Sequence, residues 1–163
     1  MFKHILLPTD GSATSHCAIE QCISFAKVCG AHVIGLHVIP NYHMFHHRTE
    51  MLEDARTQFD KDCIAQARKV LSQLEAVARD AGVRCDTLYV NCDHPHEEII
   101  KIARDKRCDL IAMASHGRKG LQGFLLGSET QKVLAHSGIP VLVLRAAPAT
   151  AAAEILAQLG SPI

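Results

Sequence analysis

Apolar residues follow two alternating patterns along the chain, which predict strands and helices in turn. Short runs of strand length occur at 5–8, 33–39, 84–90, 110–114 and 139–144. Apart from 84–90 they are almost entirely apolar, as is typical of strands buried on both faces of a parallel sheet. Longer segments between them repeat apolar residues at helical spacing and predict helices at 13–29, at 50–81, from 95 onward and from 128 onward.

Strands that alternate with helices predict an α/β fold, with a five-stranded, largely parallel sheet, right-handed crossovers and helices on both faces. Ligands of such sheets bind at the carboxyl ends of the strands, where the strand order reverses. The turn after the first strand and the loop after the fourth strand both follow carboxyl ends. If these two strands are neighbours, Asp10 and the loop face one crevice.

The loop after the fourth strand has the features of an anion-binding site. It carries glycines at positions 117, 120, 123 and 127. Ser128 and Gln131 have the spacing of a capping box, so we expect a helix to begin at Ser128 and to present unpaired backbone N–H groups toward the loop. Such groups can donate to phosphate oxygens, and Arg118 and Lys119 add positive charge. The sequence therefore predicts phosphate binding at this loop.

Composition narrows the class of protein. The 163 residues, 48% of them hydrophobic, are sufficient for a single domain with one core. Seventeen basic residues balance seventeen acidic ones, so the net charge gives no reason to expect binding to nucleic acid or to a membrane. The seven cysteines contain no C-x-x-C pair and lie mostly within apolar patterns, which is typical of reduced core thiols. We expect a cytoplasmic protein without a signal peptide or a membrane span.

Four short motifs occur in a characteristic order along the chain. They are Pro8-Thr9-Asp10-Gly11-Ser12, His37-Val38, Ser115-His116-Gly117-Arg118 and Leu125-Leu126-Gly127-Ser128. With these motifs the chain resembles the universal stress proteins, which are nucleotide-binding α/β domains, over residues 1–145. The ATP-binding branch of that family carries G-x2-G-x9-G-[S/T], and here alanine, Ala114, replaces the first glycine. An alanine is tolerable there if its backbone is ordinary strand, as the apolar run favours, but a positive φ would cost about 1 kcal/mol or more.

The resemblance implies a strand order of 3-2-1-4-5 and a site for ATP, or for AMP or ADP, with Mg²⁺ or Mn²⁺ bridging the phosphate oxygens. It implies that the adenine end of the nucleotide lies near Pro8, Thr9, Asp10 and Val38, and the ribose beside Met113 and Ala114. It implies that the phosphates are lined by Gly117, Arg118, Gly127, Ser128 and Glu129. The expected function is a role in stress response or signalling, with slow hydrolysis at most, because the sequence offers no clear general base.

The last strand is expected to be an interface. In the family's order it lies at the edge of the sheet, where an uncovered apolar strand favours pairing with a second copy. The resemblance thus implies a homodimer through Val141, Leu142, Val143 and Leu144. We expect a domain over 1–146 and a short appended helix within 147–163.

Other readings remain open at this point. Ala114 favours a dimeric scaffold that binds no nucleotide. Ser115 precedes a glycine by two positions at a strand end, as in hydrolase nucleophile elbows, but Met113 stands where that motif has glycine. The histidines at 43, 46 and 47 could bind Zn²⁺ or Ni²⁺, although no cysteine or carboxylate lies at a fixed ligand spacing.

Overall fold

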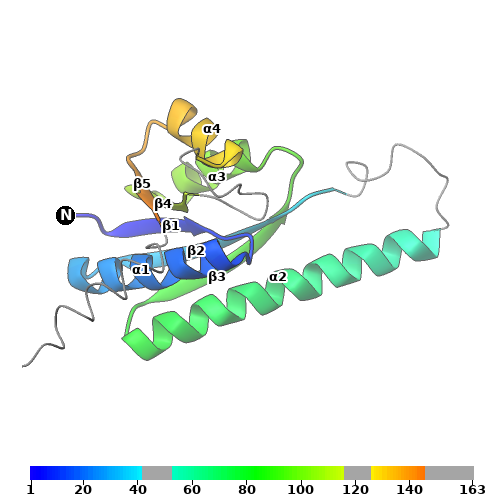
Figure 1. Cartoon of the computed structure of the whole chain (residues 1–163), viewed down its shortest axis with the longest axis horizontal. Coiled ribbons are helices and arrows are strands. Elements are labelled where there is room, and N and C mark those ends of the chain that lie inside the picture. Colours follow the sequence, from blue (N-terminus) through cyan, green and yellow to red (C-terminus); the bar gives the residue numbers. More distant parts are fainter. Residues whose placement is uncertain (42–52, 116–125, 146–163) are drawn as a thin grey trace, which may run out of the picture.

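The computed structural model describes residues 1–41, 53–115 and 126–145, with side chains from residue 57 onward in the second range (Figure 1). In chain order the elements are β1 (His4–Pro8), α1 (Ala13–Cys29), β2 (His32–Ile39), α2 (Glu53–Ala81), β3 (Cys85–Asn91), α3 (Pro95–Asp105), β4 (Leu110–Ala114), α4 (Ser128–His136) and β5 (Val141–Leu144). The predictions for His43, His46 and His47, for Gly117 and Arg118, and for the 147–163 extension lie outside the described residues.

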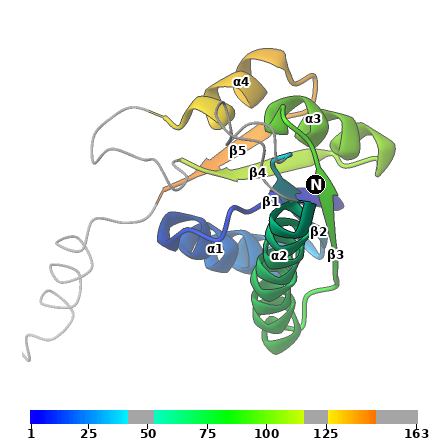
Figure 2. The ribbon, with the colours of Figure 1, turned by 90° about the vertical axis from the view of Figure 1, so that its right-hand side faces the viewer.

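The strands form one parallel sheet in the order β3-β2-β1-β4-β5, which confirms the predicted fold class and strand order. Helices α1 and α2 lie against one face of the sheet, and α3 and α4 lie against the other (Figures 1 and 2). The sheet is thus the middle layer of three, and its strands meet helices on both sides.

Burial on both faces explains why the middle of β1 is apolar without interruption. Ile5 and Leu7 of β1 belong to the core on the α1 and α2 side, whereas Leu6 between them belongs to the core on the α3 and α4 side. All three side chains are fully buried. Successive strand side chains point to opposite faces, so a strand covered on both faces needs an apolar residue at every position.

Helix α1 has the predicted bounds, 13–29. The Ser12 side chain caps the helix, since Oγ accepts a hydrogen bond of 3.1 Å from the Ser15 N–H. Gly30 ends it with a left-handed φ of 62°, a conformation that glycine adopts without strain. Helix α3 begins with Pro95 at its first position, also as predicted.

The predicted capping box at the start of α4 is wrong. The helix does begin at Ser128, but Gly127 is its N-cap residue and offers no side chain to the helix. The Gln131 side chain, which a capping box turns back to the N-cap backbone, instead donates from Nε2 to the Leu126 carbonyl at 2.7 Å. The strand predicted at 139–144 begins at Val141, two residues later than expected. The Ile139 N–H does not join the sheet, because it is bonded to the Ser137 hydroxyl at 3.0 Å.

At the amino end of the sheet, Asp109 joins β1 to β4. Its carboxylate accepts hydrogen bonds from the backbone N–H groups of Lys3, at 2.8 Å, and His4, at 3.0 Å. Burial by itself would raise the pKa of Asp109, but the hydrogen bonds from His4 and Lys3 lower it below the usual 3.8. The folded protein therefore favours the ionised carboxylate.

This pKa predicts acid sensitivity. A carboxyl group with a lowered pKa in the folded state stabilises the fold fully above its unfolded pKa, and this stabilisation is lost as the pH falls through the folded pKa. We expect the Asp109→Asn variant to be less stable than the wild type at pH 6, and we expect this difference to shrink as the pH falls below 3.8. Urea unfolding at several pH values measures the free energy of unfolding of the wild type and of the variant. A difference between them that stays constant with pH would contradict the lowered pKa of Asp109.

Candidate functional site

The carboxyl ends of β1, β2 and β4 meet at one edge of the sheet. Pro8 at the end of β1 pairs with Leu36 of β2, and Leu6 pairs with Ile111 of β4. The turn after β1 and the segment that leads from β4 to α4 therefore share this edge, as the sequence predicted. It is the edge at which parallel α/β sheets bind ligands.

The turn after β1 is held by its own side chains. The Asp10 carboxylate accepts a hydrogen bond of 3.0 Å from the Ser12 N–H through Oδ1, and Gly11 has a φ of 76°, which suits glycine. The buried Thr9 hydroxyl is hydrogen-bonded to the Ser15 hydroxyl of α1. Asp10 thus forms the turn and lies, half-buried, at the edge where a ligand role was predicted for it.

His37 of β2 contacts the same turn. Its Nδ1 lies 2.8 Å from the carbonyl oxygen of Thr9, and the residue is only 6% exposed. The sequence analysis included His37 in a motif but assigned it no role. The available signal was a single histidine inside a continuously apolar strand, where a buried polar ring needs a hydrogen-bond partner.

Two hydrogen bonds connect the end of β4 to the start of α4. The Gly127 N–H donates to the Ser115 carbonyl at 2.7 Å, and the Thr130 hydroxyl donates to the Ala114 carbonyl at 3.0 Å. The first turn of α4 is thereby fixed at the carboxyl end of β4. Residues 116–125, which lie between these two points in the sequence, are outside the described ranges.

Ala114 fits its position without strain. It is the last residue of β4 and pairs with Leu144 of β5. Among the described non-glycine residues, Arg107 is the one with a positive φ, so Ala114 has the ordinary strand backbone that the sequence analysis favoured. The replacement of the motif's first glycine by alanine therefore carries no backbone penalty.

The start of α4 can receive an anion. This helix has nine residues, and the first N–H groups of a helix have no partner within it. Gly127 contributes no capping side chain, and Ser128 exposes its hydroxyl at the first helical position. The partial positive charge of a helix N-terminus adds to these donors.

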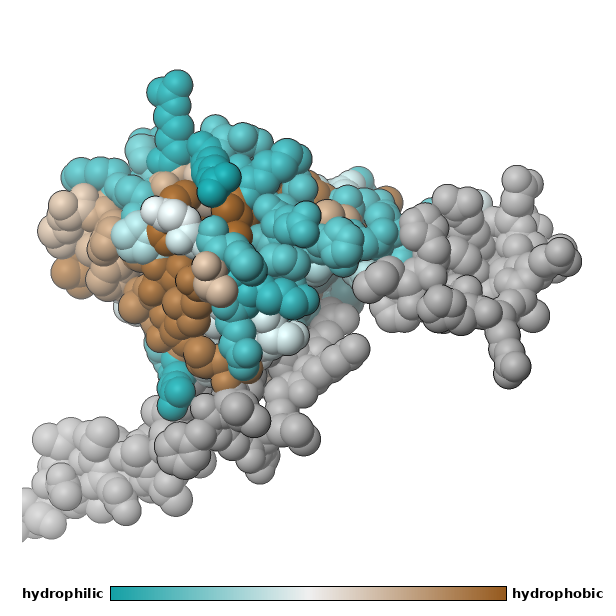
Figure 3. Space-filling model, turned by 90° about the horizontal axis from the view of Figure 1, so that it is seen from above, coloured by the Kyte–Doolittle hydropathy of each residue, from teal (hydrophilic) through white to brown (hydrophobic). Residues whose placement is uncertain are grey.

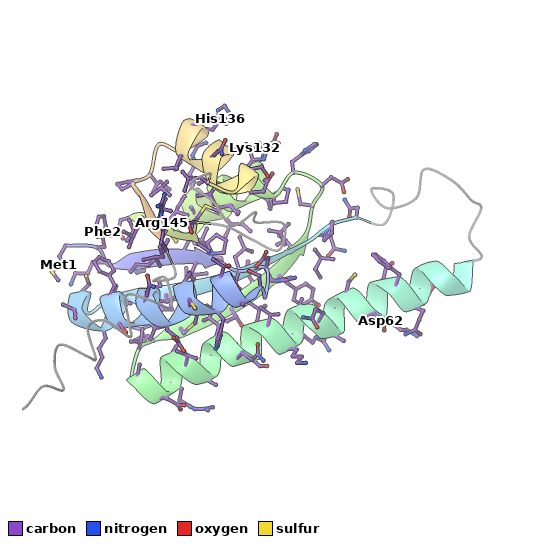
Figure 4. The ribbon with its side chains drawn as sticks, viewed as in Figure 1. Met1, Phe2, Asp62, Lys132, His136 and Arg145 are labelled. Atoms are coloured by element: carbon purple, nitrogen blue, oxygen red, sulfur yellow. The ribbon has the colours of Figure 1, made fainter. Side chains whose placement is uncertain are left out.

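The Glu129 carboxylate is bound to neighbouring groups of α3 and α4. Oε2 accepts from the His96 N–H at 2.9 Å and lies 3.2 Å from His96 Nδ1, while Oε1 accepts from Lys132 Nζ at 2.8 Å. Figure 4 shows Lys132 on α4. Burial alone would raise the pKa of Glu129, but the hydrogen bonds from Lys132 and His96 lower it. The backbone N–H of Glu129 can therefore donate to a phosphate, while its carboxylate is bound by His96 of α3 and by Lys132.

The remaining described groups limit other chemistry. Ser115 is 3% exposed, which does not suit the exposed nucleophile of a hydrolase. Among the described side chains, no group of three histidine, cysteine or acidic residues could hold a metal ion. None of the described helices combines the length and the hydrophobicity needed to cross a membrane.

A hollow of about 150 Å³ adjoins the turn after β1 on the side of α1 and α2. It is lined by Thr9, Gly11, Ser12, Ala13, His16, Ile19, Val70 and Gln73. Ligand pockets usually have volumes of roughly 300–1,000 Å³, so this hollow is too small for a whole nucleotide.

Solved structures with the same fold include nucleotide complexes. A universal stress protein in complex with cAMP is 20% identical to this chain, with a TM-score of 0.65. The matched region covers 88% of this chain and 97% of that protein. The universal stress protein of Archaeoglobus fulgidus in complex with dAMP is 17% identical, with a TM-score of 0.63, and covers 89% and 98%. At these identities the similarity shows the fold alone.

A closer similarity is found in Methanocaldococcus jannaschii. Its universal stress protein MJ0577 is 31% identical over 156 residues, which are 89% of this chain and 96% of the relative. The solved structure of MJ0577 has a TM-score of 0.79 and 33% identity, and covers 91% of this chain and 99% of its own. The model of the universal stress protein family matches residues 1–145. The chain therefore belongs to the universal stress protein family.

Proposed function

We propose that this protein binds an adenine nucleotide, ATP foremost, in the crevice at the carboxyl ends of β1 and β4. The observation that carries the proposal is the start of α4. It is free of a capping side chain, and a hydrogen bond from Gly127 to Ser115 fixes it at the end of β4. The cAMP and dAMP complexes of family members support an adenine nucleotide as the ligand.

The residues divide between the two ends of the ligand. The adenine end lies against the β1 turn, at Pro8, Thr9 and Asp10, and against Val38 of β2, with Met113 and Ala114 beside the ribose. The phosphates lie against Gly117, Arg118, Gly127, Ser128 and the backbone N–H of Glu129. Since β1 is paired with both β2 and β4, one nucleotide lying along this edge can reach both groups.

Mg²⁺ or Mn²⁺ accompanies the triphosphate and is held mainly by phosphate oxygens and water, because these ions keep most of their hydration. Hydrolysis is slow at most, since the sequence supplies no clear general base at the γ-phosphate. The protein acts in the cytoplasm in stress response or signalling. Its nucleotide-binding domain spans 1–146, and 147–163 is an appended segment.

Analysis of the nucleotide that copurifies with the protein tests this function. The purified protein is denatured, and the released small molecules are identified by liquid chromatography and mass spectrometry. We expect adenine nucleotide in a ratio to protein that approaches one. If no nucleotide is released and added Mg-ATP produces no binding heat, the nucleotide function is wrong and the dimeric scaffold remains.

We propose that two copies pair through β5. This strand is an edge of the sheet, and all four of its apolar residues are only half-buried. Figure 3 shows apolar surface at this edge, beside α4. Leu134 of α4 is also exposed, at 42%. A second β5 would cover this surface and satisfy its open backbone groups.

A proline at position 143 should prevent this pairing. The Leu144 carbonyl accepts from the Ser115 N–H, so the backbone groups of Val143 point to the open side of β5. Val143→Pro removes one outward donor and leaves the β4 ladder in place, and we expect it to convert the dimer to a monomer in light scattering. The control is Tyr89→Pro, which makes the same outward change at the β3 edge and should leave the dimer intact. A monomeric wild type, or a dimeric Val143→Pro, would refute the interface.

A further inference from the structure

We propose that His37 is a positioning residue for the nucleotide site: it sets the orientation of the turn that carries Asp10, and thereby the recognition of the adenine end. The role in recognition rests on the proposed function. The role in fixing the turn rests on the geometry of the protein alone and can be measured without a ligand.

Two residues of β2, Leu36 and His37, form hydrogen bonds with the backbone N–H and carbonyl of Thr9. The Thr9 N–H donates to the Leu36 carbonyl at 2.8 Å, and the Thr9 carbonyl lies 2.8 Å from His37 Nδ1. Both Thr9 and His37 are 6% exposed, so these bonds are formed out of contact with bulk water. β2 therefore fixes the residue that immediately precedes Asp10.

Chemistry determines which nitrogen of His37 carries the proton. A carbonyl oxygen can only accept a hydrogen bond, so Nδ1 must be the donor to Thr9. The imidazole thus presents an Nδ1–H to the turn, in the neutral as well as in the charged ring. Phenylalanine in this place would leave a buried carbonyl without that donor.

The bond acts on Asp10 through the peptide plane. The Thr9 carbonyl and the Asp10 N–H belong to one planar unit, so a hydrogen bond that fixes the carbonyl also fixes the direction of the Asp10 N–H. Beyond it, the Asp10 carboxylate accepts from the Ser12 N–H at 3.0 Å, which closes the turn. His37 therefore fixes the orientation of the turn toward the crevice. The contact does not involve the start of α4, where the phosphates are proposed to bind.

Two isosteric replacements separate this role from simple packing. The side-chain amide nitrogen of asparagine can occupy the place of Nδ1, whereas that of glutamine extends to the place of Nε2. His37→Asn therefore keeps the donor to Thr9, and His37→Gln loses it. His37→Phe keeps the ring and loses both nitrogens. Val83→Ala, a truncation of a buried residue outside the site, serves as the control for general loss of stability.

The binding experiment compares Mg-ATP with inorganic tripolyphosphate by calorimetric titration. We expect His37→Gln and His37→Phe to weaken ATP binding by about tenfold, His37→Asn to bind within about threefold of the wild type, and tripolyphosphate affinity to stay within about twofold in all of them. Val83→Ala should bind both ligands as the wild type does. Equal losses for both ligands, or equal ATP affinities of the Asn and Gln variants, would overturn the proposal.

A second measurement needs no nucleotide, so it separates this inference from the proposed function. Amide hydrogen exchange of the free protein reports the Ser12 N–H, which is protected only while the turn is formed. Exchange at Ser12 should accelerate in His37→Gln and His37→Phe and stay near the wild-type rate in His37→Asn and Val83→Ala. Unchanged exchange in the Gln and Phe variants overturns the positioning role, even if the wild type binds ATP. If the wild type binds no ATP, this exchange pattern alone decides the inference.

Discussion

Replacing Gly127 with valine is expected to lower the affinity for Mg-ATP by about tenfold or more while leaving the fold intact. Gly127 has a φ of −57° and a ψ of 146°, which every residue type can adopt, so valine brings no backbone strain. Its side chain would instead occupy the start of α4, where phosphate oxygens must approach the backbone N–H groups. Calorimetric titration measures the affinity, and urea unfolding confirms that the variant is folded.

Gly138→Val is the matched control. Gly138 follows the opposite end of α4, and an added Cβ would meet nothing within 4 Å. This variant should bind Mg-ATP as the wild type does. Equal loss of binding in both valine variants would mean that the effect is a general one on α4. Normal binding by Gly127→Val would remove the start of α4 from the site.

Truncating Leu74 of α2 is expected to cause the largest loss of stability, about 3 kcal/mol in the free energy of unfolding. Leu74 is fully buried and fills the space that Gly35 of β2 leaves open. A Cβ on Gly35 would lie 2.8 Å from Leu74 Cδ1, which is closer than packed carbon atoms approach. Leu74→Ala therefore empties a closely packed contact between the helix and the sheet.

The same contact predicts a strong coupling between two variants. Gly35→Ala alone should cost about 1–3 kcal/mol, because the added methyl group overlaps Leu74. In the Leu74→Ala background the methyl group has room, so it should cost at least about 1 kcal/mol less. Urea unfolding of the four proteins measures this coupling. Gly35→Ala combined with Val133→Ala, on the opposite face of the sheet, should be additive; additivity in the Leu74 pair would refute the account.

The elements that the sequence predicted are those whose signals are local. Ile5, Leu6 and Leu7 are continuously apolar because each faces one of two helical layers, and this pattern can be read without a structure. The Ser12 cap and Gly30 define α1 because a helix end is determined by the residues beside it. The strand order came from the family motifs, since apolar patterns do not reveal which strands are neighbours.

The sequence predicted that the turn after β1 and the segment after β4 share one edge of the sheet, but it did not predict the individual contacts there. His96 lies 33 positions before Glu129, so no local pattern links the backbone of α3 to that carboxylate. The bond between His37 and Thr9, which spans 28 positions, is invisible for the same reason. The prediction of a capping box was wrong because side chains with the right spacing can also bond to other groups. Gln131, for example, donates to the Leu126 carbonyl.

Amide chemical-shift mapping in a titration with Mg-ATP tests the location of the nucleotide most directly. Saturable shifts are expected at both ends of the proposed site, in the turn at Thr9 and Asp10 and at the start of α4 at Gly127 and Ser128. The amino edge of the sheet, represented by the N–H groups of Lys3 and His4 that bind Asp109, should not respond. An absence of shifts at either end of the site, or saturable shifts centred elsewhere, would contradict the account.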